Sequence, residues 1–176
     1  MAKINTPIKL LLAKLAGQSL KNIEVSFGAI PTVTKSFGEI KTALLNNGFN
    51  LATSEDDYTF FFTSWENWKE MLAVITNIIG YFKWQAECAD CDNRADLVSA
   101  LASILFKFNT CGNVRCRTFN RKSGKTFLHR CNLIIDQLGD TYLFDIDNKG
   151  QYIRIENEEA EMGDKTYTEF EDAQYH

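Results

Sequence analysis

The sequence predicts an α+β fold in which N-terminal helices and a long central helix pack on an antiparallel sheet. Apolar residues recur at helical spacing before residue 109, whereas from Val114 onward they tend to alternate with a period of two. The chain has 176 residues, of which 45% are hydrophobic, enough to bury one sizeable core. We therefore expect one α+β domain over residues 1–156, followed by an acidic and loosely ordered tail over residues 157–176.

The first part of the chain carries the helix signals. Thr6 and Pro7 form a typical helix start, and Thr63 with Glu66 three residues later forms a capping box before a long apolar stripe. Two short strands are expected between the helices. The helices are expected over residues 8–15, 37–45, 63–80 and 92–108, and the strands over residues 23–27 and 58–63.

The second part of the chain reads as an antiparallel meander. Its strands are expected over residues 114–119, 126–136, 141–146 and 151–155. Gly124 and Gly139 lie in polar segments between them, as turns require. Consecutive strands joined by such short turns pair side by side.

Charge is distributed unevenly along the chain. The net charge is -4, which gives no general attraction to nucleic acid or to an anionic membrane, so neither is expected as a partner. A basic arm over residues 115–130 could still hold an anionic partner, or remain a solvated hairpin, or bind the acidic tail. Its candidate binding residues are Arg115, Arg117, Arg121 and Lys122.

The cysteine content and the N-terminus favour a cytoplasmic protein. There are five cysteines, an odd number, which argues against a closed disulfide framework and for reduced thiols. The first apolar stretch, residues 8–15, is interrupted by Lys9 and Lys14, so it fits neither a secretory signal nor a membrane span.

Cys91, His129 and Asp145 form the candidate catalytic site. Cys91 lies where the central helix begins, and the free amides and dipole of a helix N-terminus favour a thiolate over a thiol. His129, on an expected strand, would serve as the base, and Asp145 on the next strand would orient its ring. Each residue also has a structural explanation: a buried cysteine, a core histidine and a hairpin cap or partner of Arg130.

This order of residues resembles the papain-like and transglutaminase-like cysteine superfamily. Residues 91–95, Cys-Asp-Asn-Arg-Ala, and residues 129–132, His-Arg-Cys-Asn, are similar to motifs of small phage or bacterial transglutaminase-like and lectin-like proteins. The aromatic stretch from Trp65 to Trp68 resembles the segment that precedes these motifs, and the resemblance covers roughly residues 55–150. Asn93 and Arg94 stand where the usual Cys-Asp-Asp-Phe-Ala pattern has an acid and a bulky apolar residue.

The resemblance implies acyl transfer or hydrolysis on an unknown protein, peptide or glycan substrate, without a cofactor. In a phage-encoded protein the site of action would be the host cytoplasm. Asn132 matches the motif and is a further candidate binding residue. The alternative is a non-catalytic binding or structural protein that uses the basic arm or the groove around Cys91.

A structural zinc site is the third possibility. Cysteine pairs at short spacing are typical of such sites. The candidate ligands are Cys88, Cys91, Cys111 and Cys116, with His129 or Cys131 as possible substitutes.

Overall fold

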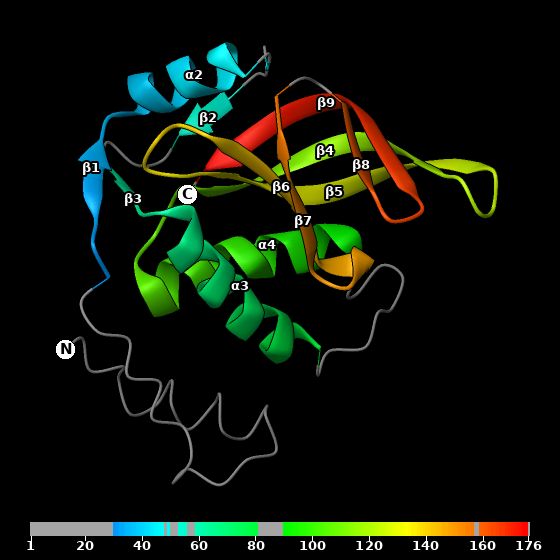
Figure 1. Cartoon of the computed structure of the whole chain (residues 1–176), viewed down its shortest axis with the longest axis horizontal. Coiled ribbons are helices and arrows are strands. Elements are labelled where there is room, and N and C mark those ends of the chain that lie inside the picture. Colours follow the sequence, from blue (N-terminus) through cyan, green and yellow to red (C-terminus); the bar gives the residue numbers. More distant parts are fainter. Residues whose placement is uncertain are drawn as a thin grey trace, which may run out of the picture.

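A large, mainly antiparallel sheet dominates the computed structural model, which describes residues 30–47, 49, 53–55, 59–80, 90–156 and 159–175 (Figure 1). Its strand order is β2-β9-β4-β5-β6-β7, and β8 pairs with β9 outside this path. All pairs are antiparallel except β2 with β9. The strands are β2 (Thr53–Glu55), β4 (Cys111–Asn120), β5 (Lys125–Ile135), β6 (Thr141–Asp145), β7 (Gln151–Ile155), β8 (Glu159–Met162) and β9 (Lys165–Tyr175). A separate pair joins β1 (Val33–Lys35) to β3 (Phe60–Phe62).

The large sheet curls so that its last strands come back toward its centre. β7 lies against β8, and the side chain of Asn148, between β6 and β7, donates to the carbonyl of Met162 on β8. The concave side encloses one apolar cluster, which includes Val114, Cys131 and Tyr167. This curvature brings residues of β5, β6 and β9 together although they are distant in sequence.

Helices cover the sheet on two sides (Figure 1). α2 (Phe37–Asn46) buries Ile40 and Leu44 in the cluster on the concave side. α3 (Trp65–Ile79) and α4 (Cys91–Leu101) bury apolar residues on the other side, among them Trp68 and Val98. α4 continues into a π-helical turn, Ala102–Phe106. No helix among the described residues is long and apolar enough to cross a bilayer.

The predicted fold class, a papain-like or transglutaminase-like α+β domain built around helices, is wrong. β-strands contain more of the described residues than helices do, and the central α-helix is only 11 residues long before its π-helical turn. The sheet exceeds the predicted four-strand meander because β8 and β9 come from the segment expected to be a loose tail. A β-rich fold with few helices is the correct description.

The segment expected to be a loose tail forms strands because its apolar residues are buried. Tyr167, Ala173 and Tyr175 are 0% exposed. The period-two pattern is hidden because Glu169 and Asp172 have positive φ angles, and the pairing of β9 with β4 shifts register nearby. Such irregularities in a strand interrupt the alternation that a sequence pattern depends on.

Most other predicted elements are confirmed with shifted bounds. α2, α3 and the four meander strands match their predicted segments, but α3 is capped by Ser64, which accepts from the amide of Asn67, and not by Thr63. Thr63 instead donates to the carbonyl of Pro31. The helix predicted over residues 8–15 and the strand predicted over residues 23–27 lie outside the described residues.

Candidate functional site

Cys91 is the first residue of α4 and follows the N-cap residue Asp90. The side chain of Asp90 makes no capping hydrogen bond, so the free amides of the first helical turn are not occupied by it. The Cys91 thiol is partly exposed, reduced, and 3.5 Å from the Asp92 carboxylate. A sulfur in this position is open to a ligand and lies at the positive end of a helix.

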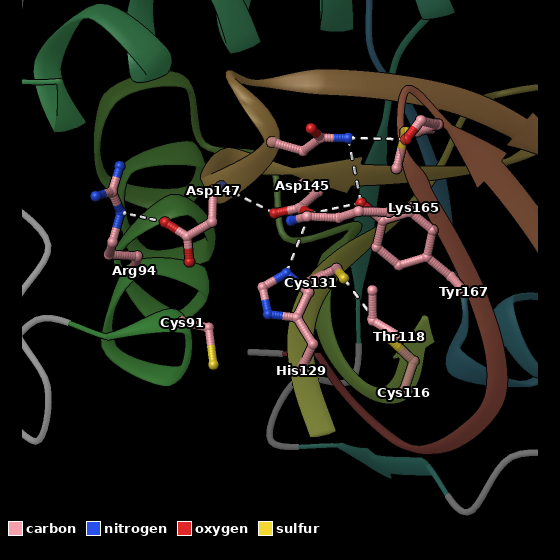
Figure 2. Close-up of polar contacts among 12 residues, drawn as sticks. Cys91, Arg94, Cys116, Thr118, His129, Cys131, Asp145, Asp147, Lys165 and Tyr167 are labelled. Carbon is pink, nitrogen blue, oxygen red and sulfur yellow. Dashed lines mark hydrogen bonds and ion pairs between the residues drawn. The ribbon is translucent and has the colours of Figure 1, made fainter. Parts of the chain in front are cut away.

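His129 faces both Cys91 and Asp145 from β5. Its Nε2 atom lies 3.1 Å from Oδ2 of Asp145, and Figure 2 shows the other ring nitrogen on the Cys91 side. The structure therefore brings together the three predicted catalytic residues. The side chains of His129 and Asp145 are 4% and 1% exposed, respectively.

Asp145 is the centre of the polar network, at the end of β6. Its Oδ2 atom accepts from the ammonium of Lys165 at 2.8 Å and from the hydroxyl of Tyr167 at 2.6 Å. Its Oδ1 atom accepts from the amide of Asp147 at 2.8 Å, which caps the short 3-10 turn that follows. Sharing a buried carboxylate among several donors fixes its orientation.

The network favours a charged pair between His129 and Asp145. Burial disfavours the imidazolium, but the neighbouring Asp145 and Cys91 outweigh it and raise the pKa of His129 to about 10. Burial also disfavours the carboxylate, but His129 and Lys165 outweigh it and hold the pKa of Asp145 well below its usual range. At neutral pH the imidazole is therefore protonated and the carboxylate ionised.

The pocket beside Cys91 has a volume of about 590 Å³. Its polar wall contains the ion pair between Arg94 and Asp147, whose Nε and Oδ1 atoms are 3.0 Å apart and mostly buried. Its apolar wall contains Phe127 and Leu128, which are 39% and 59% exposed. A chain with both polar and apolar parts can therefore bind next to the sulfur.

Arg94 departs from the family pattern but has a definite structural role. It comes from the first turns of α4, and Asp147 comes from the turn after β6, so their ion pair joins the two elements that carry Cys91 and Asp145. Asp147, expected to be only a turn residue, completes this link. The ion pair between Arg94 and Asp147 therefore holds α4, which carries Cys91, at a fixed distance from the turn that follows Asp145.

Asn132, predicted to bind a ligand, holds α4 against the sheet instead. It is 0% exposed, and its side-chain nitrogen lies within 3.0 Å of the carbonyl of Ala95 and the hydroxyl of Ser99. It also donates to the carbonyl of Gly112 on β4. These bonds fix the helix that carries Cys91, so Asn132 acts on the site through α4.

The basic arm binds the acidic tail. Arg117 contacts Glu169 at 2.7 Å, and Arg121 contacts Glu161 at 2.7 Å. This is the third of the arrangements considered from the sequence. Arg115 and Lys122 are exposed on the same hairpin, so the arm's role in holding a partner stays a prediction for these two residues.

The four predicted zinc ligands are not brought together as a set. Cys111 and Cys116 lie in different apolar clusters on the two sides of the sheet, and Cys88 lies outside the described residues. Cys116 instead contacts Cys131, with their sulfurs 3.6 Å apart. Burial raises the pKa of the Cys111 thiol to about 12, which disfavours the thiolate that a metal needs.

A different group of possible ligands surrounds Asp145. Ligand atoms of His129, Cys131 and Asp145 lie within 4.8 Å of one another. The Lys165 ammonium occupies the same carboxylate oxygen and would repel a cation there. The arrangement suits an ion-pair network better than a metal site.

Lys165 and Tyr167 were missed by sequence reasoning because both belong to β9. Figure 2 shows both of them beside Asp145, where they donate to its Oδ2 atom. Alternation on β8, where Ala160 and Met162 are buried, was the available signal that strands continue beyond residue 157.

No family model and no curated protein matches this chain. Its structure resembles that of PSL1a in a complex with E64, with a TM-score of 0.53 and 16% identity over 80% of this chain and 50% of that chain. It also resembles a Polyporus squamosus lectin bound to the human-type influenza-binding epitope Neu5Acα2-6Galβ1-4GlcNAc, with a TM-score of 0.49 and 16% identity, over 68% and 45% of the two chains.

The chain spans about half the length of each of these structures. At 16% identity, the likeness to PSL1a concerns the fold alone. What this site does is therefore argued from its own geometry.

Proposed function

We propose that this chain is a cysteine-dependent acyl-transfer or hydrolase domain in which Cys91 is the nucleophile. The observation that carries the proposal is that Cys91 and His129 line the same pocket, while Nε2 of His129 lies 3.1 Å from Oδ2 of Asp145. In such an arrangement the base activates the sulfur and the acid orients the base. From the resemblance to transglutaminase-like cysteine proteins, the proposal keeps only the roles of Cys91, His129 and Asp145.

The charge state of His129 supports its part in the proposal. With the pKa of His129 raised to about 10 by the groups that outweigh its burial, its ring carries a proton at neutral pH. A thiolate on Cys91 would then face a positive ring and the helix N-terminus. His129 would act first as a proton donor.

The reaction would proceed in two halves. The Cys91 sulfur forms a bond to a carbonyl carbon, and the carbonyl oxygen takes the negative charge near the free amides of the first turn of α4. As this oxyanion collapses, the bond to the leaving nitrogen or oxygen breaks and His129 supplies the proton. Water or an acceptor amine then attacks the thioester, gives a proton to His129, and releases the Cys91 thiolate.

Thiol reactivity tests this proposal directly. At pH 6, iodoacetamide should alkylate Cys91 at least about tenfold faster than a cysteine in a short peptide, because a free thiol is almost fully protonated there. Peptide mapping by mass spectrometry would assign the modified residue. E64, the compound in the PSL1a complex, is a second probe.

Matched variants separate activation from simple exposure. His129→Gln keeps a polar side chain but removes the imidazole, and it should slow alkylation of Cys91 to the rate of the peptide. Lys122→Gln, on the exposed turn of the basic arm, is the control and should leave the rate unchanged. A wild-type rate equal to that of the peptide at pH 6 would rule out the nucleophile.

Non-catalytic binding is the second candidate function. A second pocket of about 600 Å³ lies away from Cys91, and its lining combines the exposed ring of Phe61 with polar side chains such as Asp96, Ser103 and Gln174. An apolar face with a few polar groups is the usual composition of a small-molecule site. A glycan, with hydroxyls and apolar ring faces, would suit this lining.

Glycan binding is tested independently of Cys91. Binding to an array of glycans should be lost in Phe61→Ala and Asp96→Ala and retained in Cys91→Ser. A glycan signal that none of these variants changes would contradict a site in this pocket. Retained alkylation together with no glycan signal would leave the cysteine proposal as the single function.

A further inference from the structure

One cationic side chain that lines the Cys91 pocket forms no ion pair with the described residues. Arg94 is paired with Asp147, and Lys165 with Asp145. Lys149 lines the same pocket, is exposed, and has no ion-pair partner within the part of the chain that the structure describes. Its positive charge is therefore available to a ligand in the pocket.

The balance of charges around the Cys91 sulfur also favours the binding of an anion. The pocket or its immediate floor contains four groups that are cationic at neutral pH, Arg94, His129, Lys149 and Lys165. Against them stand three carboxylates: Asp145, Asp147, and Asp92, whose Oδ1 lies 3.5 Å from the Cys91 sulfur. A pocket that keeps an excess positive charge attracts and orients anions.

The backbone holds Lys149 at this position. Lys149 ends the short 3-10 turn after Asp145 with a left-handed φ of 61°, and Gly150 follows with a φ of 66°. A Cβ on Gly150 would lie 2.6 Å from the hydroxyl oxygen of Thr76, so the turn rests directly against α3. Only glycine permits this approach, and the turn that presents Lys149 is therefore fixed by packing.

We propose that the pocket beside Cys91 selects acyl donors that carry an anionic group, such as a carboxylate, near the reacting carbonyl, and that Lys149 binds this group. The inference rests on the proposed function and names the substrate class of the same site. A lysine suits this role because its ammonium is a compact charge on a flexible stem and can reach anions of different shape.

Two alkylating reagents that differ in charge test the proposal. Iodoacetate is anionic and iodoacetamide is neutral, but both transfer a two-carbon group to sulfur with loss of iodide. The quantity to measure is the ratio of their rate constants at Cys91, divided by the same ratio for a short cysteine peptide. At low salt this relative ratio should exceed one in the wild type by about three- to tenfold.

Charge removal and charge reversal at Lys149 should lower the ratio in steps. Lys149→Gln should reduce it about threefold and Lys149→Glu about tenfold, and added salt should compress both effects. Lys107→Glu is the matched control, because Lys107 is also exposed, also follows a helical turn, and has a φ of 64°. It lines the second pocket, so the ratio at Cys91 should stay at the wild-type value.

The outcomes distinguish this inference from the proposed function. A slow iodoacetamide reaction at pH 6 rejects the nucleophile, whereas the charge ratio is still measured on longer incubation at higher pH. A wild-type relative ratio of one, or equal effects of Lys149→Glu and Lys107→Glu, overturns the anion site. Unchanged circular dichroism of both variants excludes unfolding as the cause.

Discussion

The ion pairs at Asp145 and those on the basic arm use the same residue types in opposite environments. Asp145 is 1% exposed and shares one oxygen among His129, Lys165 and Tyr167. Arg121 and Glu161, on the arm and β8, are 41% and 59% exposed and meet at a similar distance. The distance between the charged atoms therefore does not show which ion pair contributes more to stability.

Burial decides the difference between the two regions. A charge removed from water must be compensated by its neighbours, so loss of one partner in the interior leaves others uncompensated. Exposed pairs exchange protein contacts for water at little cost. The buried network should therefore control stability and chemistry, and the arm should control neither.

The largest effect is expected from removing the carboxylate of Asp145. Asp145→Ala leaves His129 and Lys165 without their shared anion and should lower the free energy of unfolding by about 3–5 kcal/mol. Urea denaturation at pH 7 measures this loss. Asp145→Asn, which keeps the size and an acceptor oxygen, should lose less, and an equally stable Asp145→Ala protein would show that the network does not stabilise the fold.

The second effect is a pH dependence of stability. The pKa of His129 is raised to about 10, so its contribution is complete below the unfolded value of 6.5 and is lost as the pH rises through about 10. Wild type should exceed His129→Gln in unfolding free energy at pH 7, and this gap should shrink by on the order of 2–3 kcal/mol by pH 10.5. A constant gap would contradict a charged imidazole.

The acid side of the same profile has the opposite sign. The pKa of Asp145 is held low by His129 and Lys165 against the effect of its burial, so its contribution is present above 3.8 and is lost as the pH falls through the lowered value. The difference between wild type and Asp145→Asn should therefore be greatest near neutral pH.

A smaller loss is expected when a single donor to Asp145 is removed. Tyr167→Phe keeps the ring but removes the hydroxyl that donates to Asp145 and accepts from Asn148. Hydrogen bonds to charged groups support a decrease of about 1–2 kcal/mol in unfolding free energy. Tyr152→Phe, at an exposed ring on β7, is the control, and equal losses in both variants would remove the special role of Tyr167.

The smallest effect is expected on the arm. Arg121→Gln, Glu161→Gln and the double variant should each move the urea midpoint by less than about 0.3 M at physiological salt. The double-mutant cycle isolates the coupling between the two side chains. A coupling free energy between Arg121 and Glu161 as large as the loss of unfolding free energy in Tyr167→Phe would show that burial does not decide the strength of these contacts.

The sequence predicted the elements that local patterns determine. Cys91 at the head of a helix, and His129 and Asp145 on neighbouring strands, follow from alternation and turn signals in the meander, and the structure brings the three together. Their catalytic role stays a prediction. The strands of the meander pair with neighbours that are close in sequence, so the meander could be predicted from local patterns.

The rest could not be predicted because it depends on distant pairing. β9 pairs with β4 and places Lys165 and Tyr167 beside Asp145, but positive φ angles at Glu169 and Asp172 hide its alternation. The fold class was wrong for the same reason, since this strand and β8 extend the sheet. Asn132 matched a motif, yet only packing against α4 reveals that it binds the helix.

The place of β9 in the sheet also sets an order of events during synthesis. The ribosome releases Asp145 before Lys165, which follows 20 residues later in the chain. Until β9 has emerged, the aspartate lacks two of its donors, and the histidine next to Cys91 lacks a fixed anchor. Before β9 inserts beside β4, a nascent chain therefore holds the pair of His129 and Asp145 without the donors from Lys165 and Tyr167.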